Sequence, residues 1–160
     1  MKKNFIILAL VVCAFSAGCD LSNEVNRGQT AADAACSDGA TQLRLEREVL
    51  ALGTHYPDCR SSVADYQERR DSCRNGVDQA VSAAKAQQFI TLSTPQARGD
   101  ELTSRIIEEN CVSGDGRADA PCICGVLYFR IYYGRELRQS AQAAANRSLR
   151  EPFRIIDSKY

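Results

Sequence analysis

The chain has 160 residues, with 20 basic and 20 acidic side chains, eight cysteines and a single histidine. A formal net charge of zero argues against binding to nucleic acid, which needs a surplus of Lys and Arg opposite the phosphates. One histidine, without a serine-nucleophile or phosphate-loop motif, argues against the common catalytic sites. We therefore expect a protein that is not an enzyme and needs no cofactor.

The first 18 residues have the three zones of a secretory signal peptide. Two lysines supply positive charge, residues 5–15 form an apolar run, and small residues follow at 16–18. The run is too short to cross a bilayer as a helix, which takes about 20 apolar residues. The order of charge, apolar run and small residues is typical of a segment that is cut off. We expect a signal peptide at 1–18.

A cysteine follows the small residues directly, in the sequence Phe15-Ser16-Ala17-Gly18-Cys19. This stretch resembles the lipobox of bacterial lipoproteins, and the resemblance covers the first twenty residues. It implies that the Cys19 thiol receives a diacylglyceryl group, that the signal is cut before Cys19, and that the new amine is acylated. Each buried CH₂ contributes roughly 0.8 kcal/mol, so several acyl chains on one residue would anchor the protein stably.

The residue after the cysteine carries information about the membrane. Asp20 follows Cys19 directly. This resembles the retention signal of many inner-membrane lipoproteins of bacteria, in which an Asp follows the lipidated cysteine. The resemblance implies the periplasmic face of the inner membrane, with the outer membrane as the alternative. Residues 19–29 are expected to form the lipidated cysteine and a polar, flexible tether with a reach of about 17 Å for ten residues. Residues 30–160 would then form one periplasmic helical domain.

Cys13 leaves with the signal and Cys19 carries lipid, so six cysteines remain for the mature domain. They are Cys36, Cys59, Cys73, Cys111, Cys122 and Cys124. An even number of cysteines in an oxidising compartment predicts three disulfides. The alternative is a metal site, but the chain has no Cys-x-x-Cys pair and His55 is its only histidine, so the usual zinc spacings are not met. The same pattern favours structural bridges over redox-active thiols.

Two helical segments flank a break at 53–58, where Gly53 and Pro57 are typical of a helix end. The first is expected from Thr30 or Ser37 to Leu52. The second begins near Cys59 and has the period of a long amphipathic helix. The stripe of the first is Cys36, Ala40, Leu43, Arg47 and Leu50, and that of the second is Cys59, Val63, Tyr66, Arg70, Cys73, Val77, Ala80 and Ala84.

These two helices predict one disulfide. Cys59 and Cys73 share a helix face but stand about 21 Å apart at 1.5 Å per residue, whereas a disulfide needs Cα atoms within about 7 Å. In an antiparallel pair of helices, residues equidistant from the turn lie opposite each other, and the midpoint between Cys36 and Cys73 falls inside the break. We expect Cys36–Cys73 as the first bridge, which leaves Cys59 for Cys122 or Cys124.

A third helix is expected after Thr94-Pro95, with Thr as the cap and Pro at the first helical position. Asp100 is the alternative cap, and the helix runs towards Cys111. Residues 112–121 then form a loop with a cysteine near each end, which favours a bridge across it. Asp115 and Asp119 in this loop lack the alternating ladder and the final Glu of a calcium loop.

The remaining chain begins with Cys122-Ile123-Cys124, whose thiols are too close to pair and should reach different partners. The aromatic and β-branched residues of 126–133 suit a strand, but helical spacing continues into the alanine-rich stretch 140–145, so we take a helix on length. Residues 153–156 leave two alternatives, a terminal strand or an apolar tail. The fold is thus predicted as all-α, a small disulfide-stapled helical bundle of three to four helices.

Charge is uneven along the chain. Residues 122–160 contain seven basic and three acidic side chains, whereas residues 20–121 contain 17 acidic and 11 basic ones. The basic tail has three alternatives: pairing with the acidic part, contact with anionic lipid headgroups, or contact with a protein. Pairing within the chain is the commonest role for such a segment.

A small domain held by lipid and disulfides is suited to binding another protein at the membrane, because an anchor raises the local concentration there. Lipoproteins of this size and plan resemble two protective families, the entry-exclusion lipoproteins of conjugative elements and the immunity lipoproteins that neutralise periplasmic toxins. The expected location at the inner membrane resembles that of the entry-exclusion lipoproteins more closely. A structural role in the cell envelope is a further alternative. The candidate partner-binding residues are Tyr132, Tyr133, Arg135, Arg138, Arg147 and Arg150.

Overall fold

The protein is described by a computed structural model that covers residues 22–52, 56–60, 67–86 and 96–157, without the side chains of 96–100 and 148–157. Within these ranges the chain is helical apart from short turns and a loop at 111–119. The prediction of a small, disulfide-stapled helical bundle is therefore confirmed. A helix at 22–35 is followed by α2 (Gly39–Leu52), α4 (Gln67–Ala86), α5 (Gln96–Asn110) and α6 (Ala120–Asp157).

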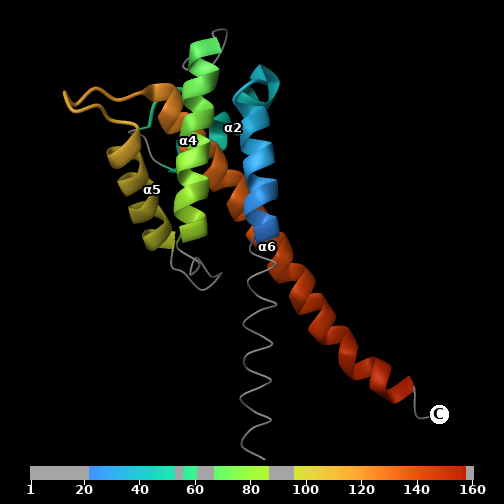
Figure 1. Cartoon of the computed structure of the whole chain (residues 1–160). Coiled ribbons are helices and arrows are strands. Elements are labelled where there is room, and N and C mark those ends of the chain that lie inside the picture. The colour runs from blue at the N-terminus through green and yellow to red at the C-terminus, as the bar shows by residue number, and fades with distance from the viewer. Residues whose placement is uncertain (1–21, 53–55, 61–66, 87–95, 158–160) are drawn as a thin grey trace, which may run out of the picture.

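The first half of α6 forms the centre of the bundle, with α4 and α5 packed against it and helix 22–35 beside it (Figure 1). Every residue from Cys122 to Phe129 is buried. A helix that is enclosed on all sides needs apolar residues on every face. This explains why 126–133 resembles a strand in composition and is nevertheless helical, as we expected.

The axes of α4 and α6 approach so closely that their backbones touch. A Cβ atom added to Gly76 would lie 2.0 Å from the carbonyl oxygen of Cys122, and one added to Gly125 would lie 1.9 Å from that of Cys73. Both distances are far inside van der Waals contact, so only glycine fits at either place. The crossing of the two central helices therefore depends on a pair of glycines.

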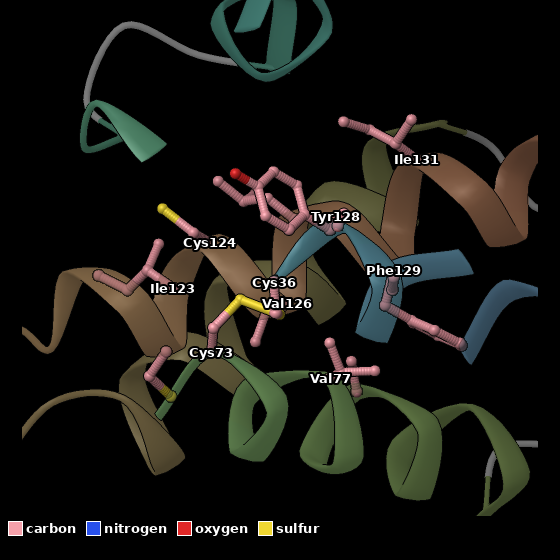
Figure 2. Close-up of a cluster of buried hydrophobic side chains, with 14 of the residues drawn as sticks. Cys36, Cys73, Val77, Ile123, Cys124, Val126, Tyr128, Phe129 and Ile131 are labelled. Carbon is pink, nitrogen blue, oxygen red and sulfur yellow. A yellow bond between two sulfur atoms is a disulfide. The ribbon is translucent and has the colours of Figure 1, made fainter. Parts of the chain in front are cut away.

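Three disulfides surround this crossing. Cys36 is joined to Cys73 with Cα atoms 5.8 Å apart, Cys59 to Cys124 at 5.4 Å, and Cys111 to Cys122 at 5.5 Å. Figure 2 shows the first of them inside the buried cluster, where helix 22–35 and α4 meet. The first bridge and the divergent partners of Cys122 and Cys124 are confirmed, and the open choice for Cys59 is resolved in favour of Cys124.

Two aspartates, Asp38 and Asp119, cap the N-terminal ends of helices. Asp38 accepts hydrogen bonds from the backbone N–H groups of Ala40 and Thr41, both at 3.2 Å, at the start of α2. Asp119 accepts one from the N–H of Cys122 at 3.4 Å, at the start of α6. Side-chain oxygens at this position satisfy N–H groups that have no partner within the helix.

The tether predicted at 19–29 is wrong from Ser22 onward, because residues 22–35 are helical. Val25, Gly28, Ala32 and Ala35 lie on the buried side of this helix. They recur at steps of three and four, which is a helical stripe made of small residues. Its polar composition conceals the stripe in the sequence, and the estimated reach of the tether no longer applies to this segment.

The stripe predicted for the first helix is also wrong. The helix is interrupted by a turn at residues 36–38, and the buried side of α2 consists of Thr41, Gln42, Leu45 and Val49. The predicted stripe was counted from Cys36, which lies ahead of that turn. Since the turn resets the phase of the helix, the residues counted from Cys36 end up on the solvent side of α2.

The other predicted elements are present in part. The stripe of α4 is confirmed from Cys73 to Ala84, whereas Arg70 is exposed. Val63, Tyr66, Thr94 and Pro95 lie outside the described residues, and Asp100 lies within α5 rather than at its cap. Because α6 continues to Asp157, a terminal strand at 153–156 is excluded. No helix among the described residues is both long and apolar enough to cross a membrane.

Candidate interaction surfaces

The residues that carry the lipoprotein resemblance lie outside the described part of the chain, which begins at Ser22. Cys19 and Asp20, and the signal segment before them, therefore remain predictions from sequence. The described residues next to them belong to helix 22–35, so only two residues separate Cys19 from the first described residue of a packed helix.

Tyr133 was expected to contact a partner, and this is wrong. Only 7% of the residue is exposed. Its ring stacks on that of Phe129 with the centroids 5.3 Å apart, and its backbone lies against Gly28, where an added Cβ would come within 3.1 Å of the Tyr133 Cα. Burial raises the pKa of its phenol, and the negative charge of Glu24 adds to this. Tyr133 is a core residue of α6 at the contact with helix 22–35.

Tyr132 and Arg135 belong to a junction between helices. Arg135 forms an ion pair with Glu48 of α2, and its guanidinium carbon lies 5.1 Å from the centre of the Tyr132 ring. Both charged side chains are partly exposed, so the ion pair contributes about 0.2–1 kcal/mol, and the cation–π contact about as much. This arrangement holds α2 against α6 and leaves one face of Tyr132 covered.

Arg138 and Arg147 are exposed on the second half of α6. The Nε of Arg147 donates to the carbonyl oxygen of Ala143 at 3.4 Å, one turn back in the same helix. Residues 142–147 are exposed on all sides. The side chain of Arg150 lies outside the described part. In Figure 1 this half of α6 extends away from the bundle, beyond the other helices. Arg138 and Arg147 are thus free of the core, and contact with a partner stays a prediction for all three arginines.

Helix 22–35 and α6 run antiparallel, and their contacts end close to Ser140. Arg27 pairs with Glu136 at 3.5 Å, and the hydroxyl of Ser140 donates to the carboxylate of the buried Glu24. Beyond Ala141 the side chains of α6 are exposed as far as they are described. The last fixed contact of α6 with the bundle therefore lies next to the N-terminal end of helix 22–35.

A second exposed surface lies on α2, where sequence reasoning expected packing. Leu43 and Leu50 are 49% and 57% exposed, and they are the large hydrophobic residues that stand exposed in the described ranges. They lie seven residues apart, on one face of the helix, with the exposed Arg47 between them. Single exposed leucines need no explanation, but an apolar pair on one face of a fixed helix is typical of a contact site.

Contacts at both ends of α2 fix this helix on the bundle, with Leu43 and Leu50 on its solvent side. Asp38 caps its first turn, the Gln42 amide donates to the carbonyl oxygen of Ala35 at 2.8 Å, and Glu48 pairs with Arg135. A helix fixed at both ends loses little conformational freedom on binding, which favours affinity. The sequence analysis grouped Leu43 and Leu50 on one helix face, which is correct. It assigned that face to the core, whereas it faces solvent.

The aspartates of the 111–119 loop have structural roles. Asp115 accepts from the hydroxyl of Ser113 and pairs with Arg117 at 3.1 Å. The Ser113 hydrogen bond holds the pKa of the Asp115 carboxyl below its usual value. Asp119 accepts from the hydroxyl of Ser72 in addition to capping α6. Across the described residues no three potential metal ligands come together.

The first half of α6 contains a second buried phenol besides that of Tyr133. Tyr128 is fully buried, and its hydroxyl has no hydrogen-bond partner among the described residues. Burial raises the pKa of this hydroxyl strongly, and the charge of Asp58 acts in the same direction. The group therefore stays neutral at physiological pH, so its role is that of a large core side chain.

No protein-family model matches the chain, and no curated protein or solved structure matches it either. Any functional assignment therefore rests on the residues and their placement in the fold.

Proposed function

We propose that the chain is a lipid-anchored protein of the periplasmic side of the membrane that acts by binding another protein there. In this proposal Cys19 carries the acyl chains and Asp20 keeps the protein in the inner membrane. The disulfide-stapled bundle then presents a rigid surface to its partner, with no need for a reacting group or a cofactor.

The observation that supports the proposal most directly is the solvent face of α2. Leu43 and Leu50 stand about half exposed on a helix that is fixed from behind. Burying the exposed half of a leucine contributes about 1 kcal/mol, so the pair contributes about 2 kcal/mol to an interface, or about 30-fold in affinity. Arg47 between them is exposed and favours a partner with an apolar recess and a nearby carboxylate.

Entry exclusion is the process that we assign to this binding. A protein held at the inner membrane of a recipient cell would meet the transfer apparatus of a donor there, and occupying it would block DNA uptake. Neutralisation of a periplasmic toxin would use the same rigid face, with a soluble enzyme as the partner in place of an apparatus in the membrane.

The test is a mating assay in which recipient cells express the full chain. We expect fewer transconjugants from a donor that carries a matching conjugative element. Replacing both leucines of the α2 face (Leu43→Ser with Leu50→Ser) should restore uptake, because the apolar contact is lost. A double variant at exposed positions of α4, Ser82→Ala with Lys85→Gln, is the matched control and should exclude as well as the natural chain.

Palmitate labelling of cells that express the chain tests the anchor separately. We expect label on the natural protein and none on Cys19→Ser, which should be released from the membrane. Labelled protein without any effect on mating would overturn entry exclusion, and co-purification with a secreted toxin through the α2 face would then assign the immunity function. Retention of unlabelled Cys19→Ser in the membrane would overturn the lipoprotein assignment itself.

A further inference from the structure

The second half of α6 extends past the end of the bundle from which the anchor would emerge. Glu24 and Arg27, at the N-terminal end of helix 22–35, contact Ser140 and Glu136 of α6. Figure 1 shows α6 passing this end of helix 22–35 and continuing away from the bundle at an angle. The N-terminal end of the domain and the free half of α6 therefore lie on the same side of the molecule.

The lengths of the two segments place this half of α6 at the membrane, given the lipidation of Cys19 that the proposed function assumes. Cys19 lies three residues before Ser22, so at most about 10 Å of extended chain separates them. From Ser140 to the end of α6 at Asp157 the helix covers about 26 Å. Since the free half of α6 starts beside the N-terminal end of helix 22–35 and is longer than the available tether, it is long enough to reach the lipid headgroups.

The chemistry of this segment suits a membrane surface. Arg147 is exposed, and two further arginines follow at positions 150 and 154. Arg138 is exposed as well, but its position lies on the other side of the helix, seven residues before Ala145. On the helical backbone of α6 the apolar positions recur at steps of three and four on the side opposite to positions 147, 150 and 154; they are Ala141, Ala145, Leu149, Phe153 and Ile156. A basic face opposite an apolar face is the pattern of a helix that lies in a membrane interface.

Arg138 and Arg147 are the two of these arginines whose side chains the structure describes, and neither forms an ion pair with a described residue of the bundle. Of the acidic residues next to the start of this segment, Glu136 pairs with Arg27 and Glu24 accepts from Ser140. The segment 138–157 itself contains four arginines and two acidic residues, Glu151 and Asp157, so it has a surplus of two positive charges. Arg147 contacts only a carbonyl oxygen of its own helix among the hydrogen bonds and ion pairs of the described residues. Arg138 and Arg147 thus have no acidic partner among the described residues and can bind anionic phosphates outside the protein.

We propose that residues 138–157 of α6 lie along the membrane in which Cys19 is anchored, with the arginines among anionic phospholipid headgroups. The acyl chains and this helix then hold the domain at two points. Two points of attachment fix the orientation of the bundle, so the α2 face would be presented to its partner in one direction instead of rotating about a single tether.

The natural chain contains no tryptophan, so one introduced tryptophan reports its own surroundings by fluorescence. The acylated full chain, extracted from membranes, is reconstituted into vesicles of phosphatidylcholine with and without phosphatidylglycerol. Ala145→Trp, on the apolar side of α6, should shift to shorter wavelength and be quenched by brominated lipids. Leu43→Trp, on the solvent face of α2, is the matched control and should be neither shifted nor quenched.

The charge dependence is tested in the same vesicles. Each arginine near an anionic surface contributes about 1 kcal/mol, so Arg147→Gln with Arg150→Gln should weaken the binding of the helix to the surface by about 30-fold. Quenching of Ala145→Trp should fall accordingly on vesicles with phosphatidylglycerol. Replacing two exposed arginines outside α6, Arg60→Gln with Arg70→Gln, removes the same charge and should leave the quenching unchanged.

The outcomes separate this inference from the proposed function. If the purified chain has the mass of the acylated form but Ala145→Trp is not quenched, the surface position of α6 is overturned and the lipid anchor stands. Equal quenching with and without phosphatidylglycerol would overturn the role of the arginines. A chain without acyl mass would overturn both the anchor and the geometry that depends on it.

Discussion

At the scale of single residues, two glycines decide whether the central helices can cross. Gly125 of α6 lies against the backbone of Cys73, with 1.9 Å between its would-be Cβ and the carbonyl oxygen. Ordinarily alanine is favoured over glycine inside a helix by about 1 kcal/mol. Here the methyl group would force α4 and α6 apart, and the cost of such overpacking is typically 1–3 kcal/mol or more.

We therefore expect Gly125→Ala to lower the free energy of unfolding by about 2 kcal/mol or more. Gly134 is the matched control in the same helix, because an added Cβ there would meet only the end of the Arg138 side chain at 3.6 Å. Gly134→Ala should raise stability by up to about 1 kcal/mol. Urea unfolding followed by circular dichroism measures both, and equal effects of the two substitutions would contradict the close crossing.

A second prediction at this scale concerns the buried phenol of Tyr128, whose hydroxyl finds no partner in the described part of the chain. An unsatisfied buried hydroxyl costs about 1–3 kcal/mol. Tyr128→Phe removes the hydroxyl and keeps the ring, so we expect the midpoint of urea unfolding to stay the same or rise. A loss of stability beyond 1 kcal/mol would indicate a hydrogen bond to that hydroxyl from outside the described residues.

At the scale of elements, the start of α2 depends on one carboxylate. Hydrogen bonds from the Thr41 hydroxyl and from two backbone N–H groups hold the pKa of Asp38 below its usual value of 3.8. A carboxylate with a depressed pKa stabilises the fold above the pKa of the unfolded state and loses this effect as pH falls through the folded pKa.

We expect Asp38→Ala to destabilise the protein near neutral pH, because the cap of α2 is lost. The difference between variant and natural chain should shrink as the pH falls below 3.8, where the natural carboxylate becomes protonated as well. Thermal unfolding of both chains across this range measures it. A difference that stays constant down to strongly acid pH would show that the charge of Asp38 plays no part.

The elements also show how far sequence reasoning reaches. Helical spacing was sufficient for α4 and for the strand-like centre of α6, where the repeat is long and uninterrupted. It failed at α2, because a turn of three residues resets the phase, and this turn carries no proline and only one glycine next to it. It also failed at 22–35, where glycine and alanine form the buried stripe and hydrophobicity is a poor guide.

The disulfide at Cys36 is instructive in this respect. The pairing with Cys73 was predicted from a hairpin between two helices that meet at residues 53–58. The bridge is confirmed, but Cys36 lies at the turn ahead of α2 and not on α2 itself. The disulfide pairing could therefore be predicted correctly although the helix boundary at Cys36 was not. Of the candidate contact residues, Tyr133 follows the helical stripe of Cys122, Val126 and Phe129 in the sequence, which is a signal for core. The residue that it packs against, Gly28, belongs to a helix that was not predicted.

At the scale of the whole molecule, the three disulfides constrain the unfolded chain unequally. They span 37, 65 and 11 residues. In the chain-entropy model the longest loop contributes about 4 kcal/mol and the shortest about 3 kcal/mol. Replacing both Cys59 and Cys124 by alanine should therefore lower stability more than replacing both Cys111 and Cys122. Chemical denaturation of the two double variants gives the comparison, and the reverse order would mean that packing outweighs loop length.

The arrangement of these three loops has a consequence for breakage of the chain. The loop closed by Cys36 and Cys73 overlaps the loop closed by Cys59 and Cys124, which in turn encloses the third. Every peptide bond between Cys36 and Cys124 thus lies inside at least one covalent ring. A protease that cuts once in this region would nick the molecule without dividing it, so long as the disulfides stay oxidised. Within the described residues, a cut would separate the rings from either end of the chain only where it falls outside them, in helix 22–35 or in α6 after Cys124.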